Sequence, residues 1–157
     1  MKKVFTLLLP ATLSVMPVFL QAENLLPAPE KMLLVQGTRQ KDGTILPKAN
    51  KKAFVTSLRS RIKHVSAAMQ FSGTITGNVR GVWAMLLANN KKKKVFQKGI
   101  WLDPKQMIRD KDGKLHFAGT IDCSEIVADE IYFYFESYSN NPTPVKIEKL
   151  SLETPTE

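Results

Sequence analysis

The stretch Glu130–Tyr138, EIYFYFESY, indicates the fold class of this 157-residue chain more clearly than any other. Its apolar residues stand at every second position, with Tyr132, Tyr134 and Glu136 between them. Successive side chains of a β-strand point to opposite faces of its sheet. The alternation therefore predicts a strand that packs one aromatic face on a core and turns its tyrosines outward.

Short apolar runs separated by turn residues continue on both sides of this stretch. Asp112-Gly113 and Asn140-Asn141-Pro142 are examples of the turn residues. About eight short strands without a long helical pattern predict an all-β protein, an antiparallel β-sandwich. The other predicted strands are Met32–Gln36, Ala53–Leu58, Ala67–Thr76, Val79–Ala88, Lys94–Gln97, Leu115–Ile121 and Val145–Leu152.

The run Val79–Ala88 differs from the others because both of its faces are apolar. Trp83, Met85 and Leu87 alternate with a second apolar set that starts at Val82. Such a strand is either covered on both sides or carries its second set on a ligand-binding face.

Between residues 51 and 65 the pattern fits two structures. Phe54, Leu58 and Ile62 are spaced by four, as on one side of a helix. The β-branched pair Val55-Thr56 favours an extended chain, and we predict a strand.

The last predicted strand contains an irregularity. Ile147 and Leu150 are three residues apart, so strict alternation cannot place both on one face. A β-bulge at Glu148 or Lys149 restores Leu150 and Leu152 to the core face.

The first 22 residues have the organisation of a secretory signal peptide. A basic start, Met1-Lys2-Lys3, precedes the apolar run Val4–Leu20, and the small residue Ala22 stands before Glu23. We therefore expect residues 23–157 to form a single exported domain, secreted or periplasmic, with no transmembrane segment after cleavage.

Charge is distributed unevenly along the chain, whose formal net charge is +9. From Arg39 to Lys114 there are 18 basic and 4 acidic residues, and after Lys114 there are 2 basic and 8 acidic ones. A basic surface favours an anionic partner, in an exported protein an acidic polysaccharide or a lipid headgroup and not nucleic acid. Alternatively, the fold mixes the two halves and leaves only scattered lysines.

The four lysines Lys91, Lys92, Lys93 and Lys94 form the one low-complexity segment. At a hairpin tip or on an edge strand, lysines block pairing with a second sheet. The alternative is that they contact an anionic surface.

The residues that carry chemistry in enzymes are sparse. His64 and His116 show no metal-ligand spacing, and there is no nucleophile motif or phosphate-binding loop. The single cysteine, Cys123, is expected to be buried and inert, the alternative being an exposed thiol that pairs with another chain. We predict no catalysis, no cofactor and no metal.

Several strand motifs in the second half resemble those of the galactose-binding-like jelly roll, in particular carbohydrate-binding modules of families 4 and 9. Glu148 stands where those modules carry an aspartate. The resemblance implies a jelly-roll sandwich that binds a sugar. It rests on Phe71-Ser72-Gly73, Gly81–Leu86, Gly99–Leu102, Leu115–Ile121, Glu130–Phe135 and Ile147–Leu152.

Aromatic residues on the second face of the predicted strands are the candidate ligand-binding residues. Sugar rings stack their apolar C–H faces on aromatic rings, so Tyr132, Tyr134 and Trp83 are candidate platforms, with Trp101 contributing from the sheet edge. The sequence thus predicts a non-catalytic module that recognises carbohydrate by aromatic stacking. The alternative is an envelope or secreted interaction module with a protein partner and no sugar ligand.

Overall fold

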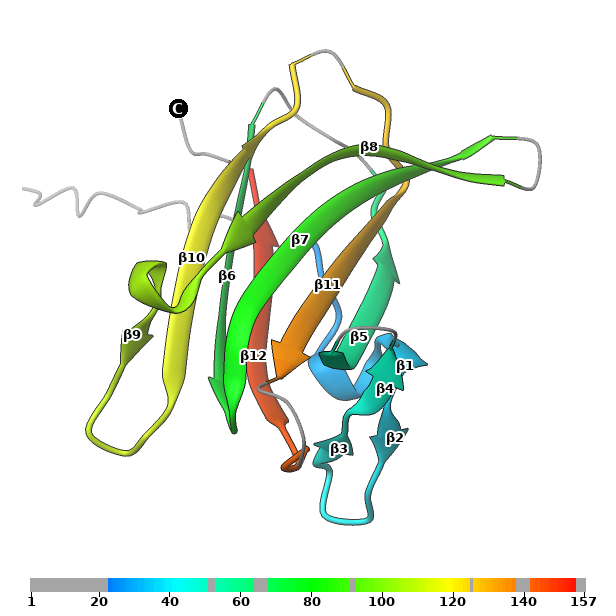
Figure 1. Cartoon of the computed structure of the whole chain (residues 1–157). Coiled ribbons are helices and arrows are strands. Elements are labelled where there is room, and N and C mark those ends of the chain that lie inside the picture. Colours follow the sequence, from blue (N-terminus) through cyan, green and yellow to red (C-terminus); the bar gives the residue numbers. More distant parts are fainter. Residues whose placement is uncertain are drawn as a thin grey trace, which may run out of the picture.

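The computed structural model describes residues 23–50, 53–63, 68–90, 93–124, 126–137 and 142–154. Within these ranges, a six-stranded and a four-stranded antiparallel sheet pack face to face (Figure 1). The predicted all-β antiparallel sandwich is confirmed. The predicted signal peptide, residues 1–22, lies outside the described residues. No helix in the described ranges is long and apolar enough to cross a bilayer.

The six-stranded sheet, called the larger sheet below, has the strand order β1-β5-β11-β7-β8, with β4 also paired to β5. Strand β11 is the predicted EIYFYFESY strand, and it pairs along its whole length with β5 and β7. The strands are β1 (Leu33–Gln36), β4 (Lys48–Asn50), β5 (Ala53–Arg61), β7 (Val79–Asn90), β8 (Lys93–Leu102) and β11 (Glu130–Ser137).

The four-stranded sheet, the smaller sheet, has the order β12-β6-β10-β9. Its strands are β6 (Ala68–Thr76), β9 (Ile108–Arg109), β10 (Leu115–Asp122) and β12 (Lys146–Glu153). The remaining elements are a separate two-stranded ribbon and two single 3₁₀ turns, of which the sequence predicted none. They are β2 (Thr38–Arg39), β3 (Ile45–Leu46), η1 (Pro29–Lys31) and η2 (Pro104–Gln106).

Aromatic side chains from both sheets form the centre of the core. As the alternation predicted, Phe133 and Phe135 of β11 are fully buried. Phe71 of β6 meets Phe133 edge to face with ring centroids 6.1 Å apart, and Phe117 of β10 meets Phe135 in the same way at 6.2 Å. These pairs join the two sheets, since burial of large aromatic surface is the main favourable term of such packing.

Strand β5 settles the two readings of residues 51–65 in favour of the predicted strand over its described part. The spacing of four between Phe54, Leu58 and Ile62 did not discriminate, because four is close to one helical turn and is also an even number of strand residues. Pairing with β11 on one edge, and with β1 and β4 on the other, holds this segment extended.

The bulge predicted near the chain end is present. Ile147 is paired with Ile75 and Lys149 with Thr74, so Glu148 is the extra residue of β12. Leu150 and Leu152 are both buried beyond it. One inserted residue reverses the face to which the following side chains point, and this brings Leu150 and Leu152 to the core. The prediction is confirmed.

Cys123 is buried, as predicted. Its thiol donates to the carbonyl oxygen of Ile121 at 3.2 Å. Burial raises the pKa of the Cys123 thiol, and the negative charge of Asp122 adds to this effect. A neutral, buried thiol is a poor nucleophile and a poor partner for another chain.

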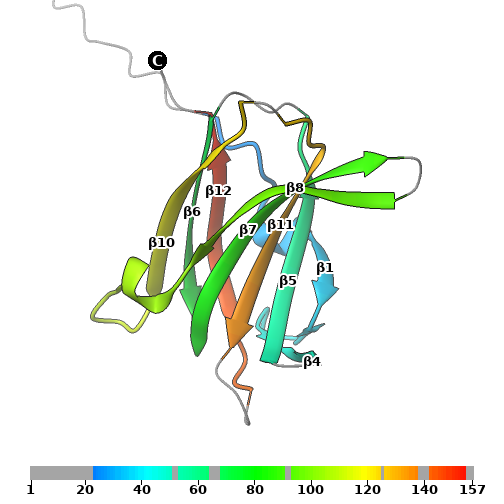
Figure 2. The same ribbon diagram turned by 45° about the horizontal axis from the view of Figure 1, so that its top comes forward.

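Strands β7 and β8 continue beyond the rest of the larger sheet. The pairing of β7 with β11 ends at Leu87, whereas its pairing with β8 continues to Asn90 opposite Lys93. The two strands therefore project as a twisted ribbon, which extends to the right in Figure 2. Strand β8 is longer than the predicted Lys94–Gln97 and includes Trp101.

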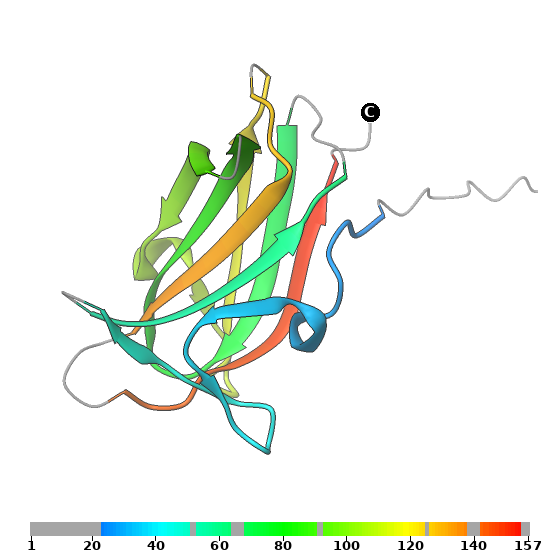
Figure 3. The ribbon, with the colours of Figure 1, turned by 90° about the vertical axis from the view of Figure 1, so that its right-hand side faces the viewer.

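The N-terminal segment closes part of the outer edge of β12, beside which it runs in Figure 3. The side chain of Asn24 donates to the carbonyl oxygen of Leu150 at 3.1 Å and accepts from the amide of Leu152 at 3.0 Å. The amide of Leu25 donates to the carbonyl oxygen of Leu152 at 2.8 Å. Asn24 thus supplies to β12 hydrogen bonds that a neighbouring strand would supply.

Candidate functional site

The outer face of the larger sheet, which points away from the core, brings three of the predicted aromatic residues into one row. Tyr134 of β11 is paired with Trp83 of β7, and Trp83 is paired with Trp101 of β8. Directly paired residues point to the same face of a sheet. The rings of Trp83 and Trp101 lie 5.6 Å apart with an interplanar angle of 48°. Trp83 and Met85 are half-buried, so the second apolar face of β7 is an open face and not a second core.

Phe96 of β8, two rows away on the same face, was not predicted. Leu86 is paired with Lys98 and Leu87 with Phe96, so Gln97 is the extra residue of a β-bulge. Phe96 and Trp101 are five residues apart and would face opposite sides of a regular strand. The bulge places both on the outer face, where Phe96 is 55% exposed. No feature of the sequence around Gln97 predicted this bulge.

Two glycines make room for these rings. A β-carbon on Gly81 would occupy the space of the six-membered ring of Trp101. A β-carbon on Gly99 would lie 3.2 Å from the ring of Phe96, closer than ordinary van der Waals contact. The ring of Trp101 therefore lies over bare backbone of the neighbouring strand β7, and the ring of Phe96 lies near bare backbone of its own strand β8. Both rings can then lie close to the sheet.

These side chains enclose a shallow depression, called the aromatic hollow below. The phenol oxygen of Tyr134 accepts a hydrogen bond from the side-chain amide of Asn50 at 3.2 Å. Glu136 forms an ion pair with Arg80 and keeps its carboxylate at the margin. The hollow thus combines aromatic surface with a hydroxyl and a carboxylate. It is lined by Trp83, Met85, Phe96, Tyr134 and Glu136.

Tyr132, the remaining predicted platform, lies one row away and is engaged by two cations. Its phenol oxygen is 2.7 Å from the ammonium of Lys94 and 3.4 Å from the guanidinium of Arg59. The same two groups lie 5.0 Å and 5.8 Å from its ring centroid. Burial raises the pKa of the Tyr132 phenol, an effect that the positive charge of Arg59 opposes. This tyrosine therefore connects β5, β11 and β8.

Of the predicted lysine cluster, the structure describes the side chain of Lys94 alone. Lys91 and Lys92 lie outside the described residues, as does the side chain of Lys93. The ammonium of Lys94 is 2.9 Å from the carboxylate of Glu130, which is buried. Lys94 therefore neutralises a carboxylate of its own chain.

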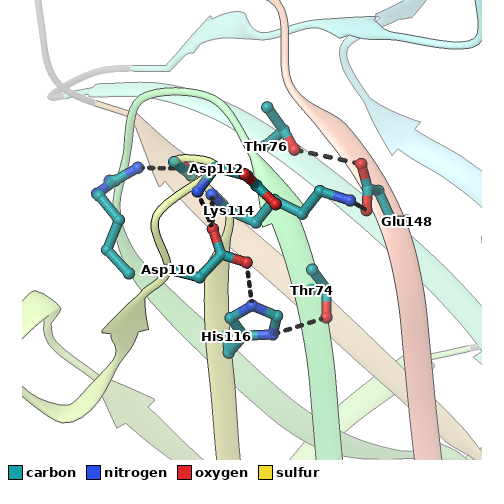
Figure 4. A network of polar contacts seen from close by, with 9 residues as sticks. Thr74, Thr76, Asp110, Asp112, Lys114, His116 and Glu148 are labelled. Atoms are coloured by element: carbon teal, nitrogen blue, oxygen red, sulfur yellow. Dashed lines mark hydrogen bonds and ion pairs between the residues drawn. The ribbon is translucent and has the colours of Figure 1, made fainter.

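A polar network covers one end of the outer face of the smaller sheet (Figure 4). The imidazole Nε2 of His116 is 2.8 Å from Asp110, and Nδ1 is 3.2 Å from the hydroxyl of Thr74. An ionised carboxylate only accepts, so Nε2 carries the proton. This hydrogen bond lowers the pKa of Asp110. Glu148, whose pKa is lowered by its hydrogen bond with Lys114, lies 2.7 Å from that ammonium.

This network links the β9–β10 turn to β6 and β12. The described residues hold no group of three or more His, Cys, Asp or Glu side chains that could bind a metal ion. The other histidine, His64, lies outside the described residues.

The fold brings the basic and acidic parts of the chain together in ion pairs. Each Lys or Arg in the described ion pairs comes from the basic segment, and each carboxylate partner comes from the acidic one. The pairs are Arg59–Glu130, Arg80–Glu136, Lys94–Glu130, Lys98–Asp122 and Lys114–Glu148. These pairs join five basic residues to four acidic ones, so part of the charge asymmetry is neutralised within the molecule.

No family model matches the sequence, and no curated protein matches it. Among solved structures, the chain is similar to a family 4 carbohydrate-binding module, with 10% identity, a TM-score of 0.47 and coverage of 78% of this chain and 77% of that one. It is also similar to the enzymatically active domain of tailspike protein 4 of bacteriophage CBA120, with 8% identity, a TM-score of 0.47 and coverage of 78% and 17%.

A third similar structure is a family 28 carbohydrate-binding module described as specific for non-crystalline cellulose. The identity is 12% and the TM-score 0.44, with coverage of 85% of this chain and 96% of that one. Two of the three structures are thus carbohydrate-binding modules, the class that the sequence motifs resemble. With TM-scores below 0.5, these similarities say nothing about what this chain binds.

Proposed function

We propose that the protein is a non-catalytic binding module that recognises carbohydrate on the outer face of the larger sheet. One observation carries the proposal: Trp83, Trp101, Phe96 and Tyr134 share an open face because of strand register and the bulge at Gln97. A sandwich needs apolar side chains only between its sheets, so an aromatic outer face calls for a ligand.

The chemistry of the aromatic hollow suits a sugar. Pyranose rings present C–H groups on one face, and these pack on the flat surfaces of Trp83 and Phe96. Hydroxyl groups at the ring edge need hydrogen-bonding partners, which the phenol of Tyr134 and the carboxylate of Glu136 offer at the margin of the hollow. Apolar walls with a few polar groups are the usual composition of a small-molecule site.

We assign different roles to the four residues predicted from the sequence. Trp83 and Tyr134 contact the sugar directly, and Trp101 supports the ring of Trp83 from β8. Tyr132 positions neighbouring groups, since its ring and hydroxyl already contact Lys94 and Arg59.

We also propose that residues 23–157 form one domain and are exported after removal of residues 1–22. The basic and apolar organisation of these residues supports this. A buried, neutral thiol at Cys123 is compatible with an oxidising compartment. Intact mass of the protein recovered from the periplasm or the medium tests it, because cleavage at the predicted position leaves Glu23 as the first residue.

Affinity electrophoresis through gels that contain neutral or acidic polysaccharides, each at low and high salt, tests sugar recognition. We expect retardation on at least one polymer that persists in high salt, because stacking on aromatic rings is not screened by ions. Trp83→Ala and Phe96→Ala should each abolish the retardation, and Tyr134→Phe, which keeps the ring, should weaken it.

The control variant is Ile108→Ala, which removes a 72%-exposed apolar side chain from the smaller sheet. Its mobility should equal that of the unmodified protein, and thermal melts should show that all variants are folded. If no polymer retards the protein, the carbohydrate proposal fails, and the alternative of a protein partner becomes the one to pursue.

A further inference from the structure

A basic cleft lies on the same outer face, at the end of the larger sheet where β5 ends and the β7–β8 ribbon begins. Four cationic and two acidic side chains converge there, beside the apolar side chain of Ile62. The charged residues of the cleft are Arg59, Arg61, Lys63, Lys94, Asp129 and Glu130.

The charges in the cleft are not balanced. Glu130 is buried and is contacted by Lys94 at 2.9 Å and by Arg59 at 3.5 Å, so its carboxylate is neutralised. Arg61 and Lys63 are exposed and have no ion-pair partner among the described residues. The remaining carboxylate, Asp129, is also exposed and has an interaction of its own. Two cations therefore face the cleft opposite one carboxylate.

Strand register connects the cleft to the aromatic hollow. Phe96, which lines the hollow, is paired with Leu87, Leu87 with Glu130, and Glu130 with Arg61. This row crosses the sheet from β8 to β5, and three strand spacings amount to about 14 Å. A ligand of a few sugar residues is long enough to contact both ends of the row.

We infer that the glycan recognised on this face is acidic, and that Arg61 and Lys63 bind its carboxylate or sulfate group. The inference rests on the proposed function, because the sugar ring itself stacks in the hollow. A guanidinium matches the two oxygens of a carboxylate or sulfate by paired hydrogen bonds, and an ammonium adds a mobile positive charge. The neutralised Glu130 beneath them keeps Arg59 and Lys94 in place.

Calorimetric titration with matched pairs of oligosaccharides tests this inference. Oligogalacturonate and its methyl ester share one backbone and differ in charge, and sulfated and unsulfated dextran oligomers do the same for sulfate. We expect the protein to bind at least one acidic member roughly tenfold more tightly than its neutral counterpart at low salt, with the difference shrinking as salt rises.

The double variant Arg61→Gln/Lys63→Gln should remove that preference and leave binding of the neutral member unchanged. Lys105→Gln/Lys111→Gln, with the same change in net charge on exposed positions elsewhere, should keep it. Polyglutamate, a carboxylate polymer without sugar rings, should bind no more tightly than the neutral sugars.

The outcomes separate the two proposals. Equal binding of charged and neutral sugars, or an unaffected double variant, overturns the acidic assignment and leaves carbohydrate recognition standing. Tight binding of polyglutamate shows a charged patch without sugar recognition and overturns the inference. If the unmodified protein binds none of the sugars, both the acidic assignment and the proposal of carbohydrate recognition fail.

Discussion

The two outer faces of this sandwich differ in kind, although the sheets behind them share one core. The smaller sheet turns hydroxyl, amide and charged groups to solvent, and they bond with one another, as Thr74 does with His116. The larger sheet turns indole, phenyl and thioether groups to solvent. Along β6 the outward residues are Gln70, Ser72, Thr74 and Thr76, whereas along β7 they are Trp83, Met85 and Leu87.

The difference between the two outer faces shows that the fold does not itself require an apolar outer face. An antiparallel sheet with one solvated face usually reads apolar inside and polar outside, and the smaller sheet follows that rule. The larger sheet departs from it on β7, β8 and β11 together. Three strands that depart at matched positions indicate selection for a surface, which is why the hollow, and not the His116 network, is the proposed site.

The largest effect that distinguishes the faces is expected from removing the charge of Glu130. Glu130→Gln leaves Lys94 and Arg59 without their buried carboxylate and should lower the free energy of unfolding by about 2 kcal/mol. Glu148→Gln on the smaller sheet breaks the ion pair with Lys114. Both groups of this pair are partly solvated, so the loss of unfolding free energy should be smaller. Urea denaturation of both variants measures the difference. Equal losses of unfolding free energy would show that the buried ion pairs of Glu130 stabilise the protein no more than the solvated pair of Glu148.

A smaller effect is expected from filling the space beneath Trp101. Gly81→Ala forces that ring away from β7 and should cost about 1 kcal/mol, because crowding a packed position strains its neighbours. Its indole fluorescence should shift to longer wavelength as the ring becomes more solvated.

Enlarging an outward residue of the smaller sheet gives the matched control. Ala118 is exposed on β10, so Ala118→Val should leave both stability and fluorescence close to those of the unmodified protein. An unchanged emission spectrum in Gly81→Ala would mean that Trp101 does not depend on the bare backbone of β7.

The smallest effect is a pH dependence confined to the smaller sheet. The hydrogen bond from His116 lowers the pKa of Asp110 in the folded state. A lowered carboxyl pKa contributes stability at pH values above the unfolded pKa of about 4, and that contribution is lost as the pH falls through the folded value. Asp110→Asn should therefore flatten the loss of stability below pH 4, measured by thermal melts across that range.

That flattening should be partial, because other carboxyls outside this contact, among them Asp42 and Asp122, also have lowered pKa values. Sugar binding on the larger sheet should not respond to Asp110→Asn. If Asp110→Asn and the unmodified protein lose stability equally below pH 4, the contact between His116 and Asp110 does not contribute to acid stability.

Periodicity predicted the sandwich because apolar and outward-facing residues alternate along strands such as β11. The residues of β11 pointed inward and outward as expected, and even the bulge at Glu148 was predictable. There, two apolar residues spaced by three had to share one face, so the sequence itself recorded the irregularity.

The composition of the site was only partly predictable for a related reason. The bulge at Gln97 puts Phe96 on the same face as Trp83, but the residues that flank Gln97 suit either face, so no conflict in the pattern reveals the bulge. Tyr132 was expected to be a free platform. Its partners Arg59 and Lys94 lie 73 and 38 residues away in the sequence, and only strand pairing brings them to it.

The side chain of Asn24 has a consequence for how copies of this protein coexist at high concentration. An open β-edge presents unpaired peptide groups to which a second molecule can add its own strand, the first step of ordered aggregation. The carbonyl group of Leu150 and the amide group of Leu152 are already bonded to the side chain of Asn24, which cannot propagate a ladder. Asn24 therefore blocks the addition of a strand from a second molecule at the outer edge of β12.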